Sequence, residues 1–259
     1  MAALHRALFV AGGVGFSLAL AFGPLGCEVG PTAAASGVLT STVTLDRFDE
    51  ALVVDSVLPV AVIGARRSDV LVEVELTITA SSAEVAERAL AAYAIQVEGS
   101  GGTRVITAAG PSQGRASGLL RIEAPRDLPL EVSSKGGSAR VEGMAAAVAI
   151  QAVGPVQLLD ARSDAVVRVE VGGAQVDTPL RPGQRVDVGA GSGDVVIALP
   201  ANPDGRFDAE APGGVASAHP ALPSRPGGVP YGITRGAGLA SVVATTRAGT
   251  VRFTVRREN

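Results

Sequence analysis

The middle of the chain repeats one phrase: LEVSSKGGSARVE (130–142), VAIQAVGPVQLLD (148–160), VVRVEVGGAQVDT (166–178) and RVDVGAGSGDVVIAL (185–199). Each copy is an alternating apolar run, a turn that contains glycine, and a second alternating run. The marker glycines Gly137, Gly154, Gly173 and Gly193 lie 17, 19 and 20 residues apart. Alternation with a period of two predicts half-buried strands, and a regular repeat of this length predicts a stacked architecture.

The same pattern extends in both directions. A weaker copy over 206–217 has its turn at Gly214, and after an irregular stretch the alternation resumes over 238–255 with a turn at Gly249. The paired glycines of these turns are expected to take positive φ. The remaining expected elements are strands over 51–63, 70–79 and 119–124, a hairpin of 94–98 with 103–107, and a loop over 110–118.

One segment has a helical period instead. Ser81 and Glu84 form a capping-box pattern, and apolar residues follow at i, i+3, i+4 and i+7 from Ala86. We therefore expect an all-β protein, an irregular β-solenoid or β-helix of short strands with glycine turns, and one short α-helix near residues 82–93. The helix should pack on the open end or flank of a sheet, where it covers unpaired strand groups.

The composition supports a core but excludes some functions. Hydrophobic residues make up 47% of the 259 residues, which is ample for a packed interior, whereas aromatic residues make up only 3%. The net charge is −3, and the chain has no basic run. A weakly acidic chain with few aromatic residues predicts neither phosphate contacts nor base stacking, so nucleic acid is excluded as a partner.

The first residues are typical of a bacterial lipoprotein precursor. Arg6 precedes an apolar run over 7–22, which is short for a membrane span, and Gly26 stands directly before Cys27. The sequence around this cysteine resembles a lipobox, although Pro24 departs from the usual leucine. We expect a signal peptide over 1–26, lipidation of Cys27, a tether over 27–37 and the solenoid domain over 38–259.

Two alternatives for the leader stay open. Ala19-Leu20-Ala21 is also an acceptable signal-peptidase site, which would give a secreted or periplasmic protein, and the apolar run could remain as an uncleaved anchor. Plain secretion would leave Cys27, the one cysteine of the chain, as a free thiol in an oxidising compartment. This liability favours the lipid anchor, which places the protein at the outer membrane or cell surface.

The register of the repeats predicts which side chains are buried. Inward positions of the third and fourth copies should form core, and the intervening charged residues should face solvent. The predicted core residues of these two copies are Val167, Val169, Val171, Val186, Val188, Val195 and Ile197. Four aspartates of the repeats, Asp160, Asp164, Asp177 and Asp187, fall at or near strand ends and are expected to be solvated turn charges.

Several of these phrases resemble the bacterial putative-adhesin family. The resemblance is carried by APRDLPLEVSSKGGSARVEG (124–143), GSGDVVIAL (191–199) and ATTRAGTVRF (244–253), and it covers about Val53 to Val255. It implies a β-solenoid domain on a secreted or membrane-tethered protein. These motifs describe turns and strands, and the family supplies no catalytic residues, so the resemblance implies a fold rather than an activity.

Catalytic and metal-binding patterns are missing from the sequence. A nucleophilic triad needs a histidine base, and beyond the leader the chain has only His219. Ser192 sits in an Ala-Gly-Ser-Gly phrase that lacks the first glycine of a nucleophile elbow. Asp194 follows Gly193 in a phrase faintly similar to a calcium repeat, but the expected role of Asp194 is to bond its own turn. We expect no catalytic residue, cofactor or metal.

The predicted function is a non-catalytic exported module, structural or adhesive, that is held at the cell envelope through Cys27. The alternatives are an envelope sensor or accessory subunit that binds another envelope protein, and a carbohydrate-active enzyme, since carboxylates and arginines are plentiful. The irregular stretch over 218–237 interrupts the repeats and is the candidate partner-binding loop, with His219, Arg225 and Tyr231 as its contact residues. A tolerated surface insertion is the alternative for this loop.

Overall fold

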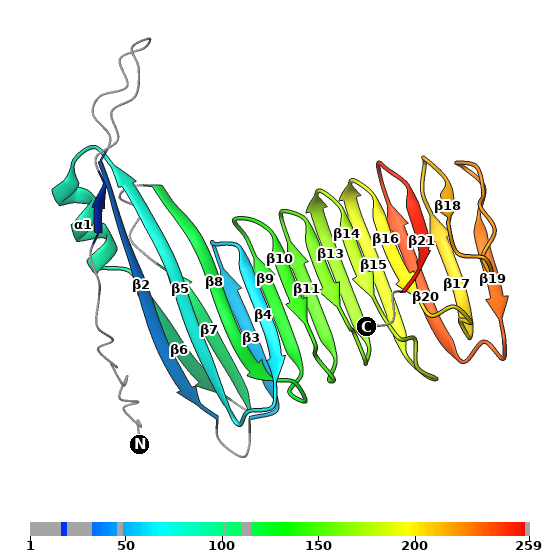
Figure 1. The fold of residues 1–259 in the computed structure, drawn as a ribbon, viewed down its shortest axis with the longest axis horizontal. Helices are drawn as coiled ribbons and strands as arrows, with labels where there is room; N and C mark the ends of the chain where they lie inside the picture. The colour runs from blue at the N-terminus through cyan, green and yellow to red at the C-terminus, as the bar shows by residue number, and fades with distance from the viewer. Residues whose placement is uncertain (1–16, 20–32, 46–48, 101, 110–114, 257–259) are drawn as a thin grey trace, which may run out of the picture.

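The computed structural model describes residues 17–19, 33–45, 49–100, 102–109 and 115–256. The described chain is mostly β-strand, in an eleven-stranded sheet, called sheet A here, and a ten-stranded sheet, called sheet B. Both sheets are mixed, and the strands lie side by side along one elongated molecule (Figure 1). Buried aliphatic side chains from the inward faces of the two sheets form one continuous core.

The repeats form the middle of this arrangement. Each repeat gives one strand to sheet B and the next strand to sheet A, and we call such a pair a rung. Successive rungs pair in parallel and in register, so that Ile150, Val167 and Val188 are neighbours across three strands. The middle rungs are β9 (Leu130–Ser134) with β10 (Ala139–Glu142), β11 (Val148–Ala152) with β12 (Val156–Leu159), β13 (Ala165–Val171) with β14 (Ala174–Asp177), and β15 (Arg185–Ser192) with β16 (Val195–Leu199).

At the C-terminal end the order of the rungs departs from the order of the chain. β17 (Gly205–Glu210) and β18 (Val215–Ser217) follow β16 in sequence but do not pair with it. The last strands, β20 (Ala240–Thr246) and β21 (Val251–Val255), lie between them and the β15/β16 rung, in parallel with both neighbours. The final rung of the chain is therefore the penultimate rung of the stack.

The N-terminal end repeats this arrangement. β3 (Ala51–Ser56) and β4 (Val60–Ala65) form the first rung of the chain, yet they lie inside the stack. The outer rung is β7 (Thr103–Ala109) with β8 (Arg115–Pro125), which come later in the sequence. β8 begins at Arg115, so residues 115–118 of the expected loop are strand instead, because they pair with Thr77–Thr79 and neighbouring residues of β5.

Antiparallel strands close the N-terminal end. β5 (Asp69–Ala80) pairs with β8 on one side and with β2 (Ala33–Thr44) on the other, and β6 (Ala94–Ser100) forms the expected hairpin with β7. The short strand β1 (Ser17–Ala19) pairs with β2. Residues 33–37 of the expected tether are thus part of a strand. The other leader residues, Cys27 and the remainder of the tether lie outside the described residues.

The helix α1 (Ala83–Ala91) lies where it is expected, packed against β2 and β5 (Figure 1). Its cap differs from the prediction. The N-cap is Ser82, whose Oγ accepts a hydrogen bond from the Val85 N–H, and Ser81 precedes it. Glu84 bonds Arg88 one turn later rather than reaching back to the cap. The helix therefore starts one residue later than the capping-box pattern predicts.

The predicted burial register is confirmed except at one residue. Six of the seven predicted core residues are at most 5% exposed, whereas Val171 is 61% exposed. Val171 is the last residue of β13, and its N–H donates to the Val153 carbonyl at the corner of the stack. Gly172 then turns the chain with a φ of 97°. Alternation ends at this corner, so both Glu170 and Val171 face outward.

The turn glycines stack along this corner, and their reasons differ. Gly193 has a φ of 106°, as expected for a left-handed turn residue. Of the paired glycines, Gly172 and Gly214 have positive φ but neither Gly136 nor Gly137 does, which corrects the expectation for that pair. A Cβ on Gly154 would lie 2.8 Å from the carbonyl carbon of Gly137 in the neighbouring rung. Glycine is needed at position 154 because the neighbouring backbone lies too close for a side chain, and not because of a special dihedral angle.

Candidate functional site

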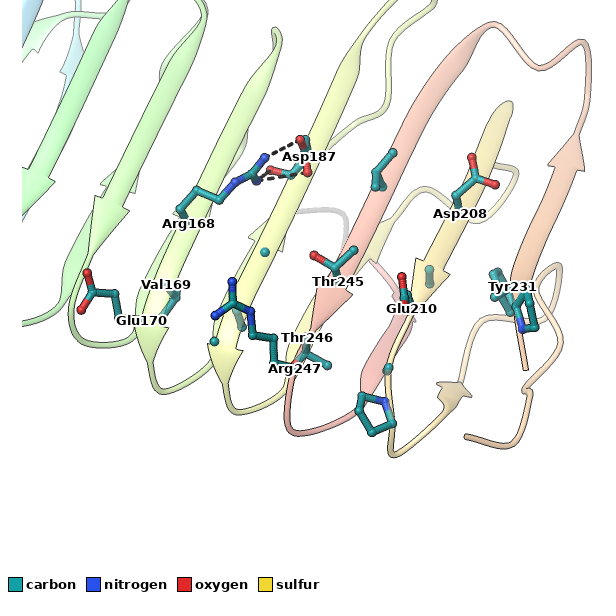
Figure 2. A pocket seen from close by; sticks show the side chains of 18 of the residues that line it. Arg168, Val169, Glu170, Asp187, Asp208, Glu210, Tyr231, Thr245, Thr246 and Arg247 are labelled. Atoms are coloured by element: carbon teal, nitrogen blue, oxygen red, sulfur yellow. Dashed lines mark hydrogen bonds and ion pairs between the residues drawn. The ribbon is translucent and has the colours of Figure 1, made fainter. Parts of the chain in front are cut away.

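An open groove of about 1580 Å³ runs across the outer face of sheet B, near the C-terminal end of the stack (Figure 2). The groove crosses β11, β13, β15, β20 and β17 and ends against residues 228–231. Because outward side chains of parallel strands align in rows, each row of the groove collects residues that are far apart in the sequence. One such row contains Gln151, Arg168, Gly189, Thr245 and Glu210.

Glycines form the floor of the groove. Gly189 and Gly191 occupy successive outward positions of β15, where other strands carry side chains. A Cβ on Gly189 would meet the Arg168 Cδ and the Thr245 Oγ1 at 3.4 Å, which is ordinary contact, so the backbone itself does not require glycine there. A Cβ on Gly191 would press on the Glu170 carbonyl oxygen. Glycine inside a strand is often found where another chain or a ligand approaches closely.

One charged pair spans the groove near its upper edge in Figure 2. The Arg168 guanidinium reaches from β13 to the Asp187 carboxylate on β15, with 3.1 Å between Nη1 and Oδ1 and 2.5 Å between Nη2 and Oδ2. Nη1 also donates to the Asp187 carbonyl oxygen. Two parallel bonds fix both side chains in one orientation. The two charges of this pair neutralise each other, so neither side chain is free to pair with a ligand.

Three other charged groups of the groove have no partner among the described residues. Glu170 on β13, Glu210 on β17 and Arg247 after β20 are exposed, and the side chain of none of them makes a hydrogen bond or ion pair within the described ranges. Asp208, beside them, is bonded by Arg206, which does not line the groove. Unpaired exposed charges on a rigid sheet remain available to a ligand.

The far end of the groove is apolar. Val229 is 41% exposed, and Pro212 and Pro230 are exposed beside it. Tyr231 is 3% exposed and its ring stacks on Phe253 with 5.6 Å between centroids. Burial raises the pKa of the Tyr231 hydroxyl, opposed in part by the charges of two nearby arginines. This hydroxyl is buried without a hydrogen-bond partner among the described residues.

Part of the predicted partner-binding loop covers the end of the stack. His219 is 2% exposed, its Nε2 lies 2.8 Å from the Pro200 carbonyl oxygen, and its Nδ1 accepts from the Ala221 N–H. The side chains of His219 and Tyr231 are thus buried, whereas residues 223–230 of the loop are exposed and 228–230 line the groove. Arg225 is exposed, and its backbone pairs with Val215 of β18. Part of the segment is also a strand, β19 (Tyr231–Arg235), antiparallel to β17.

The repeat aspartates are paired rather than free. Arg256, directly after β21, donates to Asp160 at 2.7 Å, and its Nε lies 2.8 Å from an Asp177 oxygen at an angle outside hydrogen-bond geometry. Burial tends to raise the pKa of Asp160, but hydrogen bonds from Arg162 and Arg256 outweigh it and lower that pKa. Burial raises the pKa of Asp177 more than Arg256 lowers it.

The other two aspartates are paired as well. Asp164 accepts from the Arg185 N–H, and Asp187 is held by Arg168. Asp164 and Asp187 therefore join the neighbouring strands β13 and β15, whereas Asp160 and Asp177 hold Arg256 from rungs two or three strands away, which the sequence alone does not show.

Asp194 also joins two rungs. Its Oδ1 accepts from the N–H and the hydroxyl of Thr250 at 2.8 and 2.9 Å, and these bonds lower the Asp194 pKa. The expected role in its own turn is thus replaced by a bond to the β20/β21 rung. We call this rung the inserted rung, because it lies between the β15/β16 and β17/β18 rungs. In the part of the chain that the structure describes, no group of three or more His, Cys, Asp and Glu side chains is placed to hold a metal ion. No helix of the described ranges has the length and apolarity of a membrane span.

Comparison with known proteins finds likeness in structure alone. No family model matches the sequence, and no curated protein matches it. A putative cell adhesion protein from Clostridium sporogenes has a TM-score of 0.51 and 14% identity, over 85% of this chain and 100% of that chain. This protein shares the fold, in agreement with the resemblance seen in the sequence.

Two further solved structures are more distant. A putative adhesin from Bacteroides fragilis has a TM-score of 0.34 and 10% identity, over 84% of this chain and 97% of that chain. A putative lipid binding protein from Parabacteroides distasonis has a TM-score of 0.33 and 10% identity, over 84% and 96%. Likeness at this level carries no argument about the present chain.

Proposed function

We propose that this chain is an exported, non-catalytic adhesive or structural module of the cell envelope, which binds through the groove on sheet B. The observation that carries the proposal is the groove itself. It presents Glu170, Glu210 and Arg247, all unpaired among the described residues, on parallel strands that hold them in fixed positions. A rigid, open and polar face of this kind suits the binding of a large partner.

The architecture that we propose is an irregular β-solenoid. Its support is the set of two-stranded rungs, which pair in parallel and in register from β9/β10 to β15/β16. Stacked rungs make a long molecule whose two ends are separated. Nine steps of about 4.8 Å between the ten strands of sheet B give a length of about 40 Å.

The strand nearest in sequence to the proposed anchor lies at the opposite end of this length from the groove. Cys27 precedes β2 by only a few residues, and β2 belongs to the N-terminal end of the stack. The groove extends from β11 to β19 at the other end (Figure 1). A lipid on Cys27 would hold one end at the membrane, because each buried methylene of an acyl chain contributes about 0.8 kcal/mol to membrane binding. The groove would then be presented at the end away from the membrane.

The description of the Clostridium sporogenes protein as a putative cell adhesion protein is of the same functional class as this proposal. An accessory subunit that binds a single envelope protein would use the same surface. The two functions differ in what the groove captures: an adhesin binds partners outside the cell, and a subunit binds a partner in the same membrane.

Two measurements test the proposal. In cells that make the full chain, Cys27→Ser should move the protein from the membrane fraction to the soluble fraction; an unchanged membrane fraction would place the anchor elsewhere. For the groove, Glu170→Gln/Glu210→Gln should reduce the proteins captured by mild crosslinking on intact cells. Unchanged capture would contradict binding through the groove, and capture of one stoichiometric membrane protein would favour the accessory subunit.

A further inference from the structure

We propose that the groove binds an extended, cationic segment of polypeptide that crosses the strands from β13 to β17 and places one basic side chain on Glu170 and another on Glu210. This inference rests on the proposed function and names the ligand of its groove. The argument has three parts, which are the charge of the groove, the spacing of the two carboxylates, and the groups between them.

The groove is more acidic than the rest of the molecule. Two arginines and four carboxylates line it, a net charge of −2, whereas the whole chain has a net charge of −3. Arg168 already neutralises Asp187, and Arg206 neutralises Asp208 from outside. The carboxylates left over are Glu170 and Glu210, at opposite sides of the glycine floor (Figure 2). A ligand that pairs with both must carry two positive charges.

The register of the sheet sets the distance between these charges. Glu170 follows Val169, which is aligned with Ala190 and then with Thr246, and Glu210 is aligned with Thr245. The two glutamates are thus three strands and two residues apart, or about 15 Å from spacings of 4.8 and 3.3 Å. An extended polypeptide advances about 3.3 Å per residue. Side chains at even separations share one face of an extended chain, so basic residues four positions apart, with their long side chains, would match the two carboxylates.

The groups between the glutamates favour a polypeptide over a glycan. Gly189 and Gly191 leave the floor without side chains, so that a main chain can approach the sheet. The Thr245 hydroxyl on β20 and the guanidinium of Arg247, just after β20, lie between the strands of the two glutamates and can donate hydrogen bonds to peptide carbonyl groups. The one aromatic residue that lines the groove, Tyr231, is buried against Phe253 and offers no exposed ring for a sugar.

The test is a titration of the purified full chain with fluorescent peptides, followed by anisotropy. The probe is Lys-Gly-Ser-Gly-Lys, whose two lysines share one face of an extended chain, and the comparison peptides have adjacent lysines or have glutamate in place of both lysines. We expect the spaced dilysine peptide to bind at least ten-fold more tightly than either comparison peptide. Glu170→Gln/Glu210→Gln should weaken its binding at least ten-fold, with melting unchanged.

Glu131→Gln is the matched control, because Glu131 is an exposed carboxylate on the same face of sheet B, outside the groove. It should change affinity less than two-fold. Equal affinity for adjacent and spaced lysines, or an equal loss in the Glu131 variant, would overturn the proposal. Binding of a glucosamine oligomer in preference to the peptide would also overturn it. If the peptide does not bind but the double variant still reduces capture on cells, the ligand class is wrong and the proposed function stands.

Discussion

The two ends of the stack share one topological feature and differ in how they are closed. At each end the chain-terminal rung, β3/β4 or β20/β21, lies one position inside, and a rung from nearer the middle of the chain lies outside it. The N-terminal end is then extended by the long antiparallel strands β5 and β2, with α1 against them. The C-terminal end has only β19 and a proline-rich segment over β18.

This difference shows what the irregular segment does. Its first part closes the end of the stack, because His219 and Leu222 are buried and Arg225 pairs with the edge of β18, whereas residues 228–230 are exposed and line the groove. Prolines have no N–H to offer to another strand, so such a segment also protects the edge of sheet A from further pairing. The inserted rung has a second consequence. Thr245 and Arg247 belong to β20 and the residue after it, so the groove exists only because the last rung lies inside the stack.

The largest expected effect distinguishes the inserted rung from the added strands. A chain that ends at Ala237 lacks β20 and β21, which are the parallel partners of β17 and β18 in the stack. We expect this truncation to abolish cooperative melting, measured by circular dichroism. Removal of residues 1–45 takes β1 and β2 but leaves β5 paired with β8, so a cooperative transition should remain. Similar melting of the two truncated chains would contradict the different roles of the ends.

The next effect concerns the aromatic cluster, which is found at the C-terminal end. Phe253 is fully buried, with Phe207 at 6.1 Å and Tyr231 at 5.6 Å between ring centroids. Phe253→Ala should lower the free energy of unfolding by about 3–5 kcal/mol, because it leaves a cavity among three elements. Urea denaturation measures this loss. Phe253→Leu, which fills more of the space, is the control and should cost less than half as much.

A smaller effect compares the two closures directly. His219→Ala leaves the Pro200 carbonyl and the Ala221 N–H without their partner, so we expect a loss of about 1–3 kcal/mol. Ser82→Ala removes the N-cap of α1 at the other end and should cost about 1 kcal/mol. The same urea series measures both. A histidine variant as stable as the unaltered chain would mean that the segment is a tolerated insertion.

The smallest effect is a dependence on pH at the corner where the C-terminus is held. The pKa of Asp160 is lowered in the folded state, so its ionised form contributes stability above the unfolded value of about 3.9. This contribution is lost as the pH falls through the lower folded pKa. Asp160→Asn should therefore cost about 1 kcal/mol at pH 7 and reduce the acid dependence of melting below pH 4. An unchanged acid slope would show that Arg256 does not depend on this carboxylate.

The strands themselves could be predicted from the sequence, but the order of the rungs could not. Alternation at period two places Val167 and Val188 inward wherever their strands pair, so the register holds without knowledge of the neighbours. Every rung presents the same small aliphatic residues, and any two rungs could pair in parallel. The strand β19 was missed because Gly232 and the prolines before it break the alternation.

The candidate site was hidden for a related reason. Glu170, Glu210 and Arg247 come from three rungs that meet only through the inserted order, so no local motif joins them. One signal was available in the sequence. Gly189 stands at an outward position of an alternating run, where a sheet gains nothing from glycine, whereas Gly191 is required by the close approach of the Glu170 carbonyl. The burial of His219 had no such signal, since the histidine lies among prolines and glycines without a period.

The most direct test of the inserted rung uses engineered cysteine pairs in a Cys27→Ser chain. Gly189 is aligned with Thr245 on the adjacent strand β20, and Glu210 lies one strand further. Neighbouring strands are about 4.8 Å apart, and a disulfide needs a Cα separation below about 7 Å. Gly189→Cys/Thr245→Cys should therefore crosslink on oxidation, and Gly189→Cys/Glu210→Cys should not. The reverse result would place β17 beside β15 and would contradict both the order of the stack and the groove built on it.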